Sequence, residues 1–144
     1  MTKKRSLRIL FWLIIAGTLI MIGAVYYIFN MPRRDLANEK AAYELEAKQL
    51  ITEFKKDENS STTKYLDKAI SVRGEIKSVR TLENHGVVFS LEDAMEGVSC
   101  TVDSAESVRY ATQLEKFRIG TTAKFKGRCS GMLMDVQLIN CVPE

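Results

Sequence analysis

The feature that most constrains this 144-residue chain is an unbroken apolar run near its N-terminus. Residues 9–29 read ILFWLIIAGTLIMIGAVYYIF, which is 21 residues without a charge. At about 1.5 Å of rise per residue, a helix of that length spans the roughly 30 Å hydrocarbon core of a bilayer. Trp12 lies near one end of the run and Tyr26 and Tyr27 near the other. Amphipathic rings favour the two membrane interfaces. The run therefore predicts a transmembrane helix over 9–29 that contacts lipid.

A cleavable signal peptide is the alternative interpretation of the same run. The run is longer than the usual roughly 7–15 apolar residues of a signal peptide. It ends in Tyr26, Tyr27, Ile28 and Phe29, where a cleavage site needs small residues. No cysteine follows the run until Cys100, which excludes a lipoprotein signal. The pattern favours an anchor that is not cleaved.

Basic residues flank the apolar run on both sides. The N-terminal tail 1–8 carries four and the segment after the run carries three: Lys3, Lys4, Arg5 and Arg8, then Arg33, Arg34 and Lys40. The margin under the positive-inside rule is small, but a short basic tail rarely crosses a membrane. We therefore expect a single-pass protein of the cytoplasmic (inner) membrane. Its N-terminus would lie in the cytoplasm and the remainder of the chain outside, on the periplasmic side.

The positive net charge of +3 is confined to the N-terminal segment. Residues 1–35 carry six Lys or Arg and one acid, a net charge of +5. Residues 36–144 carry fifteen Lys or Arg and seventeen acids, a net charge of −2. The basic excess therefore belongs to the flanks of the apolar run. The rest of the chain has no net attraction for phosphates.

Residues 35–66 show the periodicity of an amphipathic helix. Pro32 interrupts the chain after the apolar run, and Asp35 is a suitable N-cap for a helix that begins there. Apolar side chains then recur at the helical spacing i, i+4, i+7 and i+11: Tyr43, Ala47, Leu50 and Phe54. A polar break at 57–63 leads into a short further turn. The pattern predicts a helical stalk over 35–66 whose apolar face packs on the following domain; dimerisation through that face is the alternative.

From Ala69 the apolar period changes to two. Ile70, Val72 and Ile76 alternate with polar residues, which predicts a strand to about residue 80, and Gly74 indicates a bulge or bend within it. Similar segments predict strands at 87–91, 98–102, 123–129 and 132–142. The last two strands would form a hairpin that turns at 130–131. A helix is predicted at 104–117, with Val108, Ala111 and Leu114 facing the core. Three strands, a helix and two strands predict a mainly β domain over 68–144, a five-stranded OB-fold barrel with its helix between strands three and four.

Three segments carry a resemblance to a known family: KYLDKAISVRGEIKSV (64–79), GVSC (97–100) and KFKGRCSGMLMDVQLINC (124–141). In these segments the chain resembles the bacterial tRNA_anti-like OB-fold family, whose members carry an N-terminal signal or anchor. The resemblance covers roughly residues 40–142. It implies the fold, and the family's name refers to likeness to anticodon-binding OB domains, which does not give the function.

Candidate ligand-binding residues lie on the predicted strands. We expect a ligand on the face of strands two and three, bordered by the loops joining strands one to two and four to five. The candidates are Arg73, Lys77, Phe89, Lys126 and Arg128. Single-stranded nucleic acid needs a positive groove with aromatic platforms on which bases stack. Phe89 sits at a position that suits a core equally well, and acids balance the bases of this domain, so nucleic acid is not the favoured ligand.

No residue pattern indicates catalysis, a metal site or a cofactor. His85, the only histidine, lies in a predicted hairpin turn with Asn84 and Gly86. The acids Glu92, Asp93 and Glu96 share one turn, but their spacing matches no calcium loop, so we expect them to be solvated.

The three cysteines, Cys100, Cys129 and Cys141, form no C-x-x-C motif. With a hairpin turning at 130–131, Cys129 and Cys141 would lie about 30 Å apart, beyond disulfide reach. Cys100 could pair with either Cys129 or Cys141 in an exported domain. Burial of Cys100 as a small apolar residue is the simpler expectation.

These observations predict a membrane-anchored, non-catalytic OB-fold binding or adaptor module that faces the cell envelope and recognises a protein, glycan or small ligand. A domain that binds single-stranded, tRNA-like nucleic acid is the first alternative. An envelope structural or assembly protein is the second.

Overall fold

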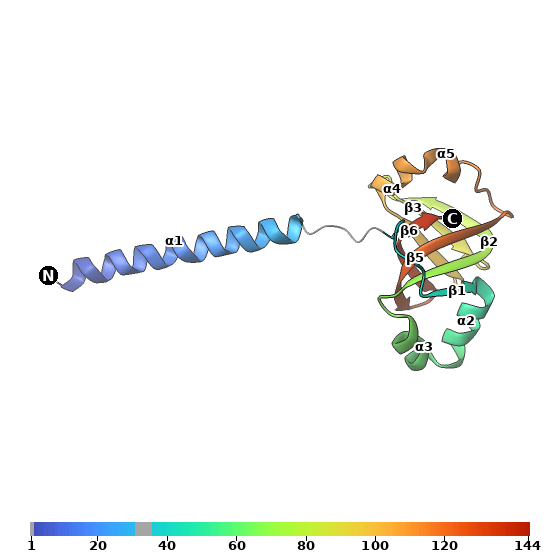
Figure 1. The fold of residues 1–144 in the computed structure, drawn as a ribbon, viewed down its shortest axis with the longest axis horizontal. Coiled ribbons are helices and arrows are strands. Elements are labelled where there is room, and N and C mark those ends of the chain that lie inside the picture. The colour runs from blue at the N-terminus through green and yellow to red at the C-terminus, as the bar shows by residue number, and fades with distance from the viewer. Residues whose placement is uncertain (1, 31–35) are drawn as a thin grey trace. The chain divides into compact units, whose positions relative to one another are not determined.

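The computed structural model describes residues 2–30 and 36–144 and divides into an N-terminal helix and a barrel domain (Figure 1). Helix α1 runs over Thr2–Phe29 and so begins within the basic tail. Its segment Phe11–Phe29 has a mean hydropathy of 2.1, and none of it is buried. The segment is long and apolar enough to cross a membrane. The break expected at Pro32 and the cap expected at Asp35 lie outside the described residues.

Five strands close into a barrel. They are β2 (Ala69–Thr81), β3 (Val87–Leu91), β4 (Val98–Val102), β5 (Thr122–Met132) and β6 (Val136–Pro143). β2 pairs with β3, β3 with β4 and β5 with β6, all antiparallel, whereas β4 pairs with β6 in parallel. An antiparallel β2–β5 pairing closes the ring. The chain is therefore mainly β, and this closed mixed barrel is consistent with an OB-fold, as the strand order predicted.

Strand β2 serves two partners in succession. Its first half, Ala69–Glu75, pairs with β5, and its second half, from Ile76 onward, pairs with β3. A register shift between Ile76 and Ser78 marks the change. Gly74, where the sequence predicts a bulge or bend, lies just before this change, and a Cβ there would also lie 2.8 Å from the Cβ of Ala47. The missing side chain lets the segment that precedes the barrel pack directly on β2.

The helical stalk predicted over 35–66 is helical only from Ala47 onward. Tyr43–Glu46 form a strand, β1, which pairs in parallel with residues 70–73 of β2. Helices α2 (Ala47–Lys56) and α3 (Glu58–Tyr65) follow. Asp57 separates them, and its side chain accepts a hydrogen bond from Ser60 N, as a helix N-cap does. β1 forms because backbone groups of β2 beyond the end of β3 are free to pair, an interaction that local periodicity does not encode.

The apolar face of this segment packs on the barrel, as expected. Ala47, Leu50 and Phe54 are at most 1% exposed and belong to the barrel's core cluster. The same face is therefore not available for the alternative of dimerisation. Tyr65 fixes α3 to α2, because its hydroxyl donates a 2.6 Å hydrogen bond to Glu53 and its ring meets that of Tyr43 edge-on at 5.1 Å.

Two short helices replace the single helix expected at 104–117. They are α4 (Ser104–Arg109) and α5 (Ala111–Leu114). Leu114 is buried as predicted, but Val108 is 75% exposed and Ala111 is also exposed, so their predicted inward orientation is wrong. The helical axis breaks at Tyr110, which lies between the two helices.

The last hairpin turns later than expected. β5 continues to Met132, so the turn falls at 133–135 and not at 130–131. Cys129 therefore pairs with Leu138 across the hairpin and is not at its tip. The separation of about 30 Å inferred for Cys129 and Cys141 rested on the wrong turn position.

Candidate functional site

The candidate binding residues divide between two faces and the core. Because Ser71 pairs with Lys126 and Arg73 pairs with Lys124, the side chains of β2 and β5 that alternate outward share one surface. We call this surface the β2–β5 face and define it by Ser71, Arg73, Lys124, Lys126 and Arg128. Three of the five candidates, Arg73, Lys126 and Arg128, thus lie on one surface. That surface is formed by β2 and β5, whereas the ligand was expected on the second and third barrel strands, β3 and β4.

The other two candidates lie elsewhere. Phe89 is 2% exposed and stacks in the core, with its ring centroid 4.9 Å from that of Phe125 and 6.1 Å from that of Phe117. It presents no ring surface to a ligand in this structure. Lys77 is exposed on β2 beyond Gly74, where its Nζ lies 2.8 Å from a carboxylate oxygen of Glu75. That contact raises the pKa of Lys77.

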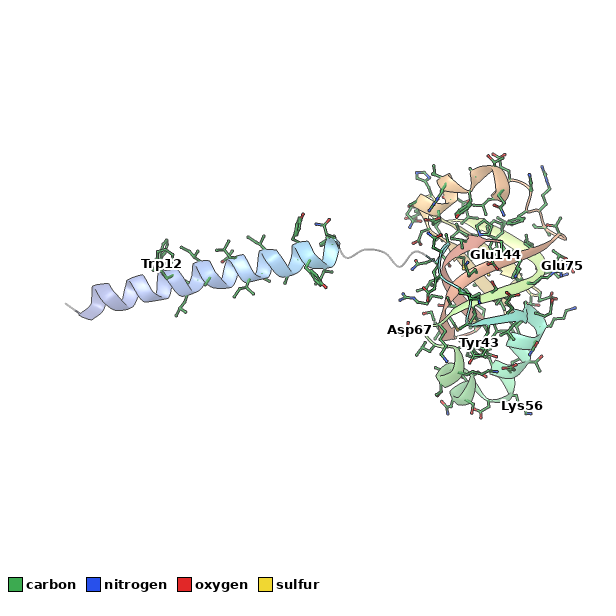
Figure 2. All side chains as sticks on the ribbon, viewed as in Figure 1. Trp12, Tyr43, Lys56, Asp67, Glu75 and Glu144 are labelled. Carbon is green, nitrogen blue, oxygen red and sulfur yellow. The ribbon has the colours of Figure 1, made fainter. Side chains whose placement is uncertain are left out.

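The two lysines of the β2–β5 face are paired with carboxylates. Lys126 Nζ lies 3.3 Å from Glu144 Oε1, and Lys124 Nζ lies 3.3 Å from Glu144 Oε2. Ser71 Oγ donates a short hydrogen bond to Glu144 Oε2. Lys124 also lies 3.2 Å from Glu44 of β1. We call Ser71, Lys124, Lys126 and Glu144 the Glu144 cluster; Glu144 is labelled on the barrel in Figure 2.

Electrostatics in the Glu144 cluster favour the charged forms. Burial opposes ionisation of Glu144, but the bond from Ser71 and the two lysines outweigh it, so the pKa of Glu144 is lowered. The pKa of Lys124 is raised, chiefly by its hydrogen bond to Glu44 and then by Glu144. Sequence reasoning missed Glu144 because no local pattern connects it to Ser71, 73 positions away.

Arg73 and Lys124 also line an open depression beside β1. It has a volume of about 340 Å³ and is lined by Glu44, Leu45, Glu46, Gln49, Arg73 and Lys124. The two acids and two bases make the wall mixed in charge. Polar groups of both signs in a shallow space suit a polar ligand better than an apolar one.

Arg128 ends the row of cations on β5. Its Nη1 lies 3.9 Å from a carboxylate oxygen of Asp67. Its Nε is buried and has no hydrogen-bond partner among the residues that the structure describes. A buried N–H group without an acceptor lowers the stability of the fold. A hydrogen-bond acceptor on a ligand would therefore bind favourably at this end of the face.

The face expected to bind the ligand has a different character. We call it the β3–β4 face and define it by the side chains of these strands and of the adjacent part of β2 that alternate with the core residues: Arg80, Val88, Ser90, Ser99 and Thr101. Val88 and Ser90 are each only 6% exposed. The face carries one charged residue and no aromatic ring. Its loop at 133–135 carries Leu133, which is 82% exposed, and Asp135 accepts a short hydrogen bond from Ser99.

The acids of the turn after β3 are engaged by the protein. Asp93 Oδ1 accepts backbone hydrogen bonds from Met95 and Glu96, which lower the pKa of Asp93. Glu92 accepts from the Glu75 backbone, and Glu96 pairs with Lys55 at 2.8 Å. Within residues 2–30 and 36–144, no three His, Cys, Asp or Glu side chains are grouped so as to hold a metal ion.

All three cysteines are buried thiols. Burial raises the pKa of Cys141 well above its usual range, and the neighbouring Cys100 thiol, with which it forms a hydrogen bond, raises it further. Burial likewise raises the pKa of Cys129. Thiols with raised pKa values are poor nucleophiles. The structure thus brings together Cys100 and Cys141, one of the two pairs proposed from sequence; a disulfide between them stays a prediction.

The closed barrel defines an OB-fold domain preceded by an apolar helix. The sequence model of the tRNA_anti-like family matches residues 1–142, so the chain belongs to that family. Among solved structures the chain is similar to a "putative nucleic acid-binding lipoprotein" from Klebsiella pneumoniae subsp. pneumoniae MGH 78578. The identity is 18% and the TM-score 0.55, over 79% of this chain and 99% of that one. At this identity the likeness concerns the fold. No curated protein matches the chain.

Proposed function

We propose that this protein is a non-catalytic binding module tethered to the cytoplasmic membrane, with its OB-fold domain facing the cell envelope. The observation that carries the proposal is α1, whose Phe11–Phe29 segment is apolar enough to span a bilayer and has no buried residue that would make it a core helix. The basic tail before it favours an N-terminus in the cytoplasm.

The state of the reactive groups supports a binding role over catalysis. In the described ranges, Lys124 and Lys126 are ion-paired, the three thiols are buried, and the pKa values of Cys129 and Cys141 are raised. Catalytic sites need a nucleophile or an acid–base pair within reach of a substrate. The Glu144 cluster and its adjoining depression offer hydrogen bonds and charge, which suit recognition of a ligand.

Cysteine accessibility in intact cells tests the topology. Leu133 is 82% exposed, so Leu133→Cys places a reactive thiol on the barrel surface, whereas the native thiols are buried. A membrane-impermeant maleimide should label Leu133→Cys in intact cells. The matched variant Ser6→Cys, in the N-terminal tail, should be labelled only after lysis. The reverse pattern would place the barrel in the cytoplasm and overturn the proposal. Intact mass of the purified protein reports whether α1 is retained.

Binding of single-stranded nucleic acid is the second candidate. It is supported by the family's likeness to anticodon-binding domains and by the name of the Klebsiella lipoprotein. The β3–β4 face lacks the aromatic platforms on which bases stack. Fluorescence anisotropy of labelled oligonucleotides with the full chain in detergent, over a series of salt concentrations, tests this candidate. An affinity that falls steeply with salt supports it, and no binding at low salt excludes it.

A further inference from the structure

The carboxylate of Glu144 is held by the donor set that proteins use to bind oxyanions. A hydroxyl from Ser71 and ammonium groups from Lys124 and Lys126 converge on its two oxygens. The three donors come from two paired strands of the barrel, which fixes their spacing. Charge-assisted hydrogen bonds of this kind are stronger than neutral ones.

Lys126 is the less exposed of the two lysines in this donor set. The residue is 8% exposed, and its Nζ contacts only Glu144 Oε1 at 3.3 Å and the Ala37 carbonyl oxygen at 3.2 Å among the contacts of the described residues. A lysine so far removed from water requires an anion beside it. Glu144 supplies that anion from a side chain that is itself 28% exposed.

The surroundings of the cluster have room for more than a carboxylate. Lys124 also lines the depression of about 340 Å³, in which Arg73 provides a further cation. A ligand whose anionic group replaced the Glu144 carboxylate would extend into this space. Departure of Glu144 into solvent requires rotation of its side chain only, because its backbone N–H remains bonded to Lys124 O at 2.9 Å.

We propose that Ser71, Lys124 and Lys126 form a binding subsite for a phosphate group, and that Glu144 occupies this subsite as an intramolecular competitor. The phosphate of a monoester offers three terminal oxygens to these three donors, one more than the carboxylate, and the phosphodiester of a lipid headgroup offers two. The inference rests on the proposed binding function and names the chemistry that the β2–β5 face recognises. The phosphate belongs either to a soluble phosphorylated compound or to a phospholipid headgroup.

Competition by Glu144 sets the expected size of the effect. The apparent affinity is the affinity of the open subsite multiplied by the fraction of molecules in which the subsite is open. If Glu144 fills the subsite in about nine molecules of ten, removing its charge strengthens phosphate binding about tenfold.

Two matched variants test the proposal in the full chain in detergent. Glu144→Gln removes the charge of the competitor. Glu44→Gln removes the same charge from the other carboxylate beside Lys124. The Nζ of Lys124 lies 3.2 Å from Glu44 and 3.3 Å from Glu144, so the two variants are matched in distance. Inorganic phosphate is titrated into each, and the amide shifts of residues 71 and 126 are followed by NMR. We expect Glu144→Gln to bind about tenfold more tightly than wild type, and Glu44→Gln to differ from wild type by less than about threefold. Glu144→Gln combined with Lys126→Gln should lose the gain.

Equal gains in both single variants would show a general charge effect and overturn the proposal, as would no gain in Glu144→Gln. Thermal unfolding of each variant shows that the barrel is intact. Titration of glycerophosphoglycerol, the water-soluble headgroup of phosphatidylglycerol, distinguishes the two sources, because the full chain would associate with any vesicle through α1. A gain for Glu144→Gln with glycerophosphoglycerol identifies the headgroup, and a gain with inorganic phosphate alone identifies a soluble ligand. The labelling of Leu133→Cys is independent of Glu144, so failure of the subsite and failure of the proposed topology are distinguishable.

Discussion

The two outward faces of the barrel satisfy their polar groups in different ways. The β2–β5 face carries long cationic side chains, and carboxylates from distant parts of the chain pair with its two lysines, Lys124 and Lys126. The β3–β4 face carries short side chains, with Arg80 as its one charge. A row of Lys and Arg on a strand is thus not by itself a positive groove, because its field depends on which acids the fold brings to it.

The same comparison separates core from surface. Phe89 belongs to β3, but it lies beneath the β3–β4 face and not on it. Ligand contacts on that face must therefore come from Arg80 and from serine, threonine and backbone groups, whereas contacts on the β2–β5 face can involve several charged side chains. Substitutions in the core, at the thiols and in the Glu144 cluster test this division, in order of decreasing effect.

The largest effect is expected at Phe89. Phe89→Ala removes a ring that packs between Phe117 and Phe125, and should lower the free energy of unfolding by about 3–5 kcal/mol. Urea unfolding in detergent measures the change. Thr101→Ala, on the outward side of β4, is the control and should change stability by less than about 1 kcal/mol. A small loss for Phe89→Ala would return this ring to the candidate binding surface.

The second effect concerns Cys100 and Cys141. During refolding with oxidised glutathione, these two thiols should lose two hydrogens to the glutathione disulfide and become linked. The link should add about 2–4 kcal/mol to the free energy of unfolding. Peptide mass spectrometry without reduction detects it. Cys129→Ser should leave the link intact, and a link that includes Cys129 would contradict the proximity of Cys100 and Cys141.

A smaller effect is expected at Lys126. Lys126→Met keeps the length of the side chain but removes one partner of Glu144. The free energy of unfolding should fall by about 1.5–3 kcal/mol, the range for a hydrogen bond to a charged group. Lys56→Met, at an exposed position of α2, is the control and should stay within about 0.5 kcal/mol of wild type. Equal losses at the two positions would mean that the Glu144 cluster adds nothing to stability.

The smallest effect is a difference in acid stability. The pKa of Glu144 is lowered in the folded protein, so its contribution is present above the unfolded pKa of about 4.3 and is lost as pH falls through the folded pKa. Glu144→Gln lacks this contribution. The stability difference between wild type and Glu144→Gln should therefore shrink as the pH is lowered below about 4.3. Thermal unfolding from pH 7 to pH 3 measures it, and a constant difference would contradict the assignment.

The strands were largely predictable because alternation along one strand records which of its sides faces the core. Ile70, Val72 and Ile76 are all fully buried, as their spacing indicated. β1 was not predictable in the same way, because Tyr43–Glu46 continue a helical pattern and become a strand only through pairing with β2. The position of the last turn was missed because Gly131 adopts a positive φ within the β5–β6 pairing, one residue before β5 ends.

Of the candidate site, the sequence located the cations but not their partners. Arg73, Lys126 and Arg128 alternate with the buried residues of their strands, and this alternation is a local property of the sequence. The pairing of Lys124, Lys126 and Arg128 with Glu44, Glu144 and Asp67 depends on contacts between distant segments. Phe89 could not be assigned to core or surface from one strand, because its neighbours Phe117 and Phe125 come from later in the chain.

The pairing of β1 with β2 has a consequence for self-association. A closed barrel has no edge strand, but within the described part of the chain β1 pairs on one side only and so restores one. This edge is four residues long and carries Glu44 and Glu46, whose side chains alternate with Tyr43 and Leu45. Short edges with like charges resist strand addition by a second chain. β1 thus covers β2 and leaves an acidic edge that opposes aggregation.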